Sequence, residues 1–152
     1  MRQIVFLTII ISFFSCSNKN IFYIDAETGN DSNSGHLQKS AWASLEKVNQ
    51  TLFRPGDKIL FKAGNSWNGQ LELQGCGTAE LPISINKYGE GKNPAIHGNG
   101  KKLHTVLLHN VEYMEVRNLE ITNTGKEQVA KRRGVIISAE NFGDCNHIVL
   151  DS

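Results

Sequence analysis

The chain of 152 residues is long enough for one domain of ordinary size. Hydrophobic residues form 39% and charged residues 20% of the sequence, a balance that excludes disorder over the whole length. Because Arg2 is the only charged residue before Cys16, 15 of the 16 basic residues and all 15 acidic residues follow it. The remainder is therefore neutral overall, which excludes an extended basic surface, and we expect no nucleic acid partner.

The N-terminal segment predicts an export signal over residues 1–15. Arg2 supplies a positive charge, and the eleven residues 4–14 are apolar apart from Thr8 and Ser12. A run of this length is too short for the hydrocarbon core of a membrane, which needs about 20 residues. It suits the apolar part of a secretory signal peptide.

Ser15 and Cys16 follow the apolar run and resemble a bacterial lipobox, in which the cysteine thiol is acylated and becomes the new N-terminus. Phe13 and Phe14 depart from the pattern, because a lipobox usually has Leu and a small residue there. The alternative is ordinary cleavage nearby, which leaves Cys16 unmodified. We expect lipid attachment at Cys16, a tether over residues 16–20, and an outer-membrane or cell-surface lipoprotein, or otherwise a secreted protein.

The other two cysteines, Cys76 and Cys145, would meet an oxidising compartment in which a disulfide is permitted. Cys76 lies between two glycines in a predicted turn, and Cys145 lies among apolar strand residues. We expect two separate free thiols, with a bridge as the alternative. The sequence contains no Cys-x-x-Cys pair, which argues against a structural zinc site.

Residues 21–24 predict a short strand, and the Asn-, Asp- and Ser-rich residues 29–35 predict a loop. The loop oxygens suit calcium, but the spacing and terminal glutamate of an EF-hand loop are missing, so we expect no metal. A helix is predicted over about 41–52, capped by Ser40 and ended by residues 55–56. Its apolar stripe, which we expect in the core, consists of Trp42, Leu45, Val48 and Leu52.

Beyond the helix, apolar residues alternate with polar ones in short segments that begin at residues 59, 71 and 83, twelve residues apart. This spacing also suits a sandwich or a barrel. In residues 114–121 the alternation changes phase: Met114 and Val116 share one face, whereas Leu119 and Ile121 are out of step by one residue. A bend at residues 117–118 would return both pairs to one interior, since Asn tolerates the left-handed conformation.

An internal repeat supports a coiling chain. A shift of 34 residues places Val111, Met114 and Val116 on Cys145, Ile148 and Leu150. Apolar segments at residues 106–108 and 135–137 precede the two copies. Repeats of this length indicate solenoids or arrays. The sequence therefore predicts an all-β solenoid.

Several motifs resemble the start of secreted right-handed parallel β-helix proteins of the pectate-lyase-like superfamily. They cover most of residues 21–152 and lie at residues 23–25, 29–35, 55–64, 81–85, 87–89 and 97–100. The resemblance implies an N-terminal cap over residues 21–56, including the helix, and the first coils of the β-helix over residues 57–152, incomplete at the C-terminus. It also implies a larger surface protein that processes polysaccharides as a lyase or glycosidase, with calcium as a cofactor in full-length relatives.

No residue matches the catalytic positions of that superfamily, so we assign no catalytic residue, no metal ligand and no cofactor to this chain. Two binding candidates remain. Trp67 is either a sugar-stacking face or a residue packed under a turn. The basic cluster Lys131, Arg132 and Arg133 is either a patch for an anionic glycan or a solvated loop.

Two groups of titratable residues carry no catalytic pattern. The five histidines suggest no nucleophile-histidine pair, and Glu112, Glu115 and Glu120 are expected to face outward from strands. Three function classes stay open. They are the N-terminal fragment of an exported carbohydrate-active enzyme, non-catalytic by itself; a glycan-binding or adhesive surface module; and an inactive structural remnant.

Overall fold

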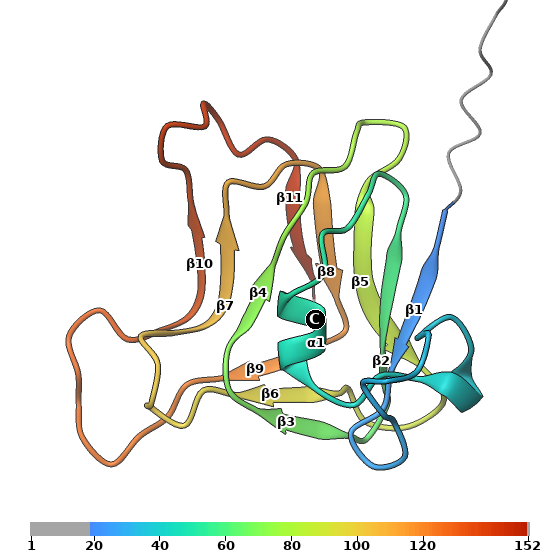
Figure 1. Ribbon diagram of the computed structural model, residues 1–152. Coiled ribbons are helices and arrows are strands. Elements are labelled where there is room, and N and C mark those ends of the chain that lie inside the picture. The colour runs from blue at the N-terminus through green and yellow to red at the C-terminus, as the bar shows by residue number, and fades with distance from the viewer. Residues whose placement is uncertain (1–18, 152) are drawn as a thin grey trace, which may run out of the picture.

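The computed structural model describes residues 19–151 as a nearly all-β fold with one short α-helix (Figure 1). The strands are β1 (Ile21–Ile24), β2 (Lys58–Lys62), β3 (Ser66–Asn68), β4 (Leu71–Leu73), β5 (Ile83–Tyr88), β6 (Ala95–His97), β7 (His104–His109), β8 (Met114–Arg117), β9 (Glu120–Thr122), β10 (Arg133–Ser138) and β11 (Ile148–Asp151). A 3-10 helix spans Gln38–Ser40, and α1 spans Leu45–Asn49.

All strand pairs are parallel, and they form three sheets. The strand orders are β1-β2-β5-β8-β11, β4-β7-β10 and β3-β6-β9. From β2 onward the chain visits one strand of each sheet in turn and then returns to the first sheet, one position further along. In Figure 1 the sheets stand as three sides around a centre, with α1 across it.

The sheets enclose one hydrophobic core, built from stacked rows of aliphatic side chains. Registers align Ile59 with Ile85, Ile85 with Val116, and Val116 with Leu150. In the alternating segments that begin at residues 59, 71 and 83, and in residues 114–121, nine apolar residues are buried: Ile59, Phe61, Leu71, Leu73, Ile83, Ile85, Met114, Val116 and Leu119. Ile121 is half-buried and packs against the same cluster. The prediction that Met114, Val116, Leu119 and Ile121 share one interior is confirmed.

The bend and the repeat are also confirmed. Asn118 has a φ of 55° and lies between β8 and β9, where the alternation changes phase. Its side-chain Nδ2 donates at 2.9 Å to Oδ1 of Asn86, in the neighbouring strand β5. Ile148 aligns with Met114, as the 34-residue shift predicts. Residues 135–137 align with residues 106–108, which makes the two upstream segments equivalent as well.

The predicted helix over 41–52 is too long and has the wrong cap. Ser44, not Ser40, is the N-cap: its hydroxyl accepts a hydrogen bond from the Lys47 backbone N–H at 3.1 Å. The helix ends at Asn49, and Leu52, expected on the buried stripe, is 72% exposed. Trp42 lies before the helix and is buried, so its assignment to the core is confirmed.

Cys76 and Cys145 are free thiols, as expected, and each Sγ approaches a backbone carbonyl oxygen, of Asn110 and Ser138 respectively. The predicted export signal and Cys16 lie outside the described residues. Within residues 19–151, no helix has the length and apolar character to cross a membrane.

Candidate functional site

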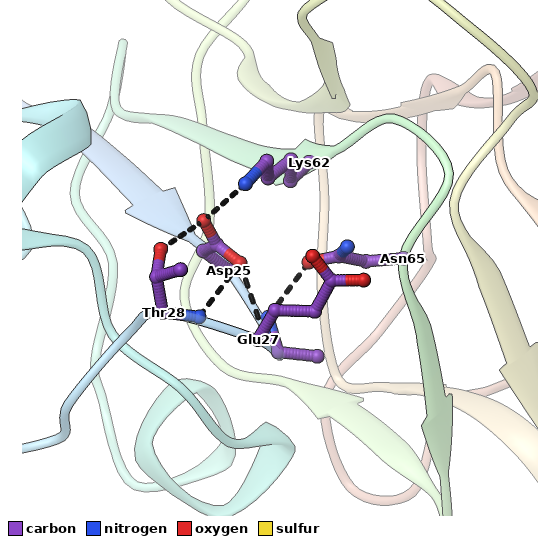
Figure 2. A network of polar contacts seen from close by, with 6 residues as sticks. Asp25, Glu27, Thr28, Lys62 and Asn65 are labelled. Atoms are coloured by element: carbon purple, nitrogen blue, oxygen red, sulfur yellow. Dashed lines mark hydrogen bonds and ion pairs between the residues drawn. The ribbon is translucent and has the colours of Figure 1, made fainter.

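An ionic network joins the loop after β1 to strand β2 (Figure 2). Asp25 follows β1 directly and is only 2% exposed. One carboxylate oxygen accepts the backbone N–H groups of Glu27 and Thr28, at 3.0 and 3.1 Å. The other accepts the Thr28 hydroxyl at 2.6 Å and Lys62 Nζ at 2.7 Å. Next to them, Asn65 Oδ1 accepts the backbone N–H of Ala26 at 2.9 Å.

The protonation state of this network makes it structural rather than catalytic. Burial alone would raise the pKa of Asp25, but the hydrogen bonds from Lys62, Thr28 and two backbone N–H groups outweigh it and lower the pKa to about 2. Asp25 also raises the pKa of Lys62. A carboxylate with so low a pKa is a poor general acid or base at neutral pH. It instead fastens the loop to β2.

Burial, together with the nearby Asp25 and Tyr23, raises the pKa of Tyr88 to about 12. The phenol of Tyr88 packs edge-on against the ring of Tyr23, with 5.1 Å between the ring centroids. Because Tyr23 is in β1 and Tyr88 in β5, this pair adds an aromatic contact across the intervening strand β2. This contact therefore links β1 and β5 on the outer surface of the first sheet, beside the ionic network.

A polar groove of about 300 Å³ lies between α1 and the turn that joins β3 to β4. Its lining includes Glu46 from the helix, Glu72 from β4 and Lys102. Asn49 holds the walls together, since its Nδ2 donates to the Gln70 carbonyl at 2.9 Å and its Oδ1 accepts the Glu72 N–H at 2.8 Å. The volume is at the lower end of the range for ligand pockets.

The groove offers hydrogen-bonding groups to a polar ligand. Among residues 19–151, the carboxylates of Glu46 and Glu72 and the ammonium of Lys102 make no internal hydrogen bond or ion pair. Carboxylates that accept and an ammonium that donates suit the hydroxyl groups of a neutral sugar. No aromatic side chain lines the groove to stack on a sugar ring.

Trp67, a sequence candidate for sugar stacking, lies in the core. Its side chain is 6% exposed and packs edge-on against Phe61, with 5.1 Å between ring centroids. Its indole N–H donates to the Ala43 carbonyl at 2.8 Å. No face of the ring is open to a sugar, so this geometry corrects the stacking interpretation and supports the alternative of packing under a turn.

The basic cluster lies at the start of β10 and in the loop before it. Arg133 Nη1 donates to the Lys131 carbonyl at 3.2 Å, and Lys131 has a φ of 64°. The Arg132 guanidinium lies against the backbone of Gly100 and Gly125. The hollow beside Arg132, of about 390 Å³, is open to solvent, and its lining also includes the carboxylate residue Glu127.

Glu115 in β8 and Glu120 in β9 face outward from strands, as expected, whereas Glu112 lies in the connection before β8 and not on a strand. Glu112 accepts a hydrogen bond from Asn146 at 2.9 Å, and Glu115 contacts Arg117 at 3.5 Å. Glu120 is exposed. The part of the chain that the structure describes contains no group of three or more His, Cys, Asp or Glu side chains able to hold a metal ion.

Sequence reasoning missed both the Asp25 network and the groove. A local signal existed for Asp25, because an aspartate after a strand with threonine three residues later is typical of a turn closed by side-chain hydrogen bonds. Lys62 is 37 residues away, and nothing in the sequence pairs it with Asp25. The groove combines residues from the helix, two strand ends and a later loop, which only the fold brings together.

No protein-family model matches this chain. It is 35% identical to a lacto-N-biosidase of Bifidobacterium longum over 70% of this chain and 8% of the relative. It is 28% identical to an alpha-1,3-galactosidase A of Akkermansia muciniphila over 54% of this chain and 13% of the relative. A crystal structure of a GH136 lacto-N-biosidase from Eubacterium ramulus superposes with a TM-score of 0.67 at 32% identity, over 71% of this chain.

These relatives are glycoside hydrolases, so the similarity supports a glycan-processing type for this chain. The structural match covers only 21% of the Eubacterium ramulus chain. The chain thus spans a small part of each protein that it resembles, and the similarity does not extend to their whole length.

Proposed function

We propose that these residues are the N-terminal, non-catalytic section of an exported glycoside hydrolase related to lacto-N-biosidases. The observation that carries the proposal is the agreement of two comparisons: sequence and structure both lead to lacto-N-biosidases, at 35% and 32% identity. The substrate would be a glycan that contains lacto-N-biose, and it would be bound and cleaved mainly by other parts of the protein.

In this proposal the architecture is a right-handed parallel β-helix of the pectate-lyase-like type. Three parallel sheets visited in turn, a bend at Asn118 with positive φ, and aligned aliphatic rows support this architecture. The loop held by Asp25 and the short α1 close one end of the stack. Their role is to protect the core and to start the register for later coils.

The isolated section would not hydrolyse glycans, because inverting and retaining glycosidases need two carboxyl groups at a set separation across the sugar. Asp25, the most buried ionised carboxylate of the cap, is engaged by four hydrogen bonds and has its pKa lowered to about 2. We propose no metal or other cofactor for this section, and leave calcium to other coils of a full-length protein.

The proposal includes export by residues 1–15 and a lipid anchor at Cys16, which would hold the protein at the outer membrane or cell surface. Glycan binding without catalysis is a second candidate function, and the groove beside α1 favours it. Glu46 of α1, Glu72 of β4 and Lys102 present free polar groups there.

The test is a comparison of two samples on a chromogenic lacto-N-bioside. The first is the native protein captured from its source cells with an antibody against residues 19–151, and the second is purified recombinant 17–152. We expect hydrolysis by the captured protein alone. Activity in neither sample would contradict the glycosidase assignment, and activity in the recombinant chain would contradict its non-catalytic role. Saturable binding of the sugar that is lost in Glu72→Gln would support the second candidate.

A further inference from the structure

Two loops project together at the corner between the sheets β3-β6-β9 and β4-β7-β10 (Figure 1). They are residues 99–103, after β6, and residues 123–133, after β9. Asn123 joins them, because its Nδ2 donates to the Lys102 carbonyl at 3.1 Å and its Oδ1 accepts the Gly100 N–H at 3.0 Å. These two segments together are called the basic corner below.

Positive charge is concentrated in the basic corner. The corner contains six basic residues and one acidic residue, Glu127, whereas the whole chain carries a net charge of only +1. The basic residues are Lys101, Lys102, Lys126, Lys131, Arg132 and Arg133. None of them takes part in the three salt bridges found within residues 19–151. A group of like charges without internal partners attracts an anionic ligand.

The side chain of Arg132 occupies a cradle made by two glycines. A Cβ atom on Gly125 would come within 2.8 Å of Arg132 Nη1, and one on Gly100 within 3.1 Å of Nη2. The absence of a side chain at both positions therefore leaves room for the guanidinium. Because the guanidinium pairs with no carboxylate within residues 19–151, its fork of N–H donors is available to an oxyanion.

The hollow beside Arg132 adjoins the groove beside α1. Asn99 lines the hollow, and its Nδ2 donates at 2.6 Å to Oδ1 of Asn68, which lines the groove. Lys102 belongs to the basic corner and also lines the groove. The two depressions are therefore neighbours, and a chain of sugar residues can extend from one into the other.

The groove and the hollow differ in charge. The groove contains two carboxylates, Glu46 and Glu72, and one ammonium, Lys102, so it suits uncharged sugar hydroxyls better than an anion. The hollow contains two cations, Lys126 and Arg132, and the single carboxylate Glu127. A ligand that matches both parts has neutral sugar residues and one negatively charged substituent.

We propose that the groove beside α1 and the basic corner form one binding track for a sulfated glycan. Neutral sugar residues occupy the groove, and Arg132 and Lys126 bind a sulfate ester in the hollow. A sulfate ester presents three terminal oxygens to donors on several sides, whereas a carboxylate presents two oxygens in one plane. The inference rests on the second candidate function, glycan binding without catalysis.

The test compares three forms of one oligosaccharide that contains lacto-N-biose: the neutral form, a form with one sulfate ester and a form with one sialic acid. Their affinities for the full chain, purified in detergent, are measured by calorimetry at low and high salt. We expect the sulfated form to bind about tenfold more tightly than the neutral form, because hydrogen bonds to a charged group are the stronger ones. The preference should decrease at high salt, and the sialylated form should bind more weakly than the sulfated form.

Variants assign the preference to the hollow. Arg132→Gln should bring the ratio of the two affinities close to one. Gly125→Ala should lower the ratio without a change of charge, since the added Cβ displaces the guanidinium. Glu127→Gln should raise the ratio, because it removes the carboxylate of the hollow. The matched control is Arg54→Gln, which removes an exposed arginine outside the basic corner and should keep the wild-type ratio.

Equal affinities for the neutral and sulfated forms, in a chain that binds both, would overturn the proposal and leave the second candidate function standing. A preference that persists in Arg132→Gln, or that Arg54→Gln abolishes to the same extent, would also overturn it. So would a sialylated form that binds as tightly as the sulfated one. If none of the three forms binds, the second candidate function fails too. No readout depends on hydrolysis, so the glycosidase assignment is tested independently.

Discussion

Removing the charge of Asp25 should loosen the loop that follows β1. The pKa of this carboxyl falls from 3.8 to about 2 on folding, and each pKa unit corresponds to about 1.4 kcal/mol of differential stability. The ionised carboxylate therefore stabilises the fold by about 2 kcal/mol at neutral pH. In Asp25→Asn, the amide oxygen can still accept the two backbone N–H groups, but an N–H₂ group faces Lys62. We expect a loss of about 2 kcal/mol.

Urea unfolding followed by tryptophan fluorescence measures this loss, since Trp42 and Trp67 are both buried in the native state. The matched control is Glu27→Gln, which removes an exposed carboxylate two residues away in the same loop. Because the folded pKa is depressed, the contribution of Asp25 is complete above about pH 4 and is lost as the pH falls towards 2. The difference between wild type and Asp25→Asn should shrink over that range. A loss no larger than that of Glu27→Gln, or one unchanged down to pH 2, would refute the reasoning.

Three further variants test other parts of the account. Cys16→Ala should move the protein from the membrane fraction to the soluble fraction, and mass spectrometry of an unacylated mature N-terminus at Cys16 would contradict lipidation. Trp67→Ala should lower the free energy of unfolding by about 3–5 kcal/mol, because it empties a core site; a urea midpoint like that of wild type would show that the ring is not packed. Asn118→Ala should cost about 1–2 kcal/mol because of its positive φ, and Asn118→Gly should cost less; equal urea midpoints for the two would argue against backbone strain there.

The sequence predicted the strands in which apolar residues alternate with polar ones. The alternation in β2, β4 and β5 marks their inward faces, and the phase change at Asn118 marks a bend. The strands β3 and β6 were missed, because each has only three residues and one large buried side chain at its centre, Trp67 or Ile96. A segment with one inward side chain has no detectable period.

The helix and the candidate site depended on contacts that lie far apart in the sequence. Asp31 accepts the backbone N–H groups of Ala43 and Ser44, at 2.9 and 3.0 Å, and this places the start of α1 after Ser44. The spacing of apolar residues alone placed it earlier. The partnership of Asp25 with Lys62 and the assembly of the groove likewise follow from the stacking of the chain. The proposed class of glycan rests only on the comparisons, since no motif of this chain specifies a sugar.

The size of the native protein tests the central claim most directly. Immunoblotting of the source cells with an antibody against residues 19–151, followed by intact mass measurement of the captured species, reports that size. The account predicts a lipid-modified protein several times heavier than the 16.9 kDa of this chain. A captured species no heavier than this chain that hydrolyses a chromogenic lacto-N-bioside by itself would contradict it.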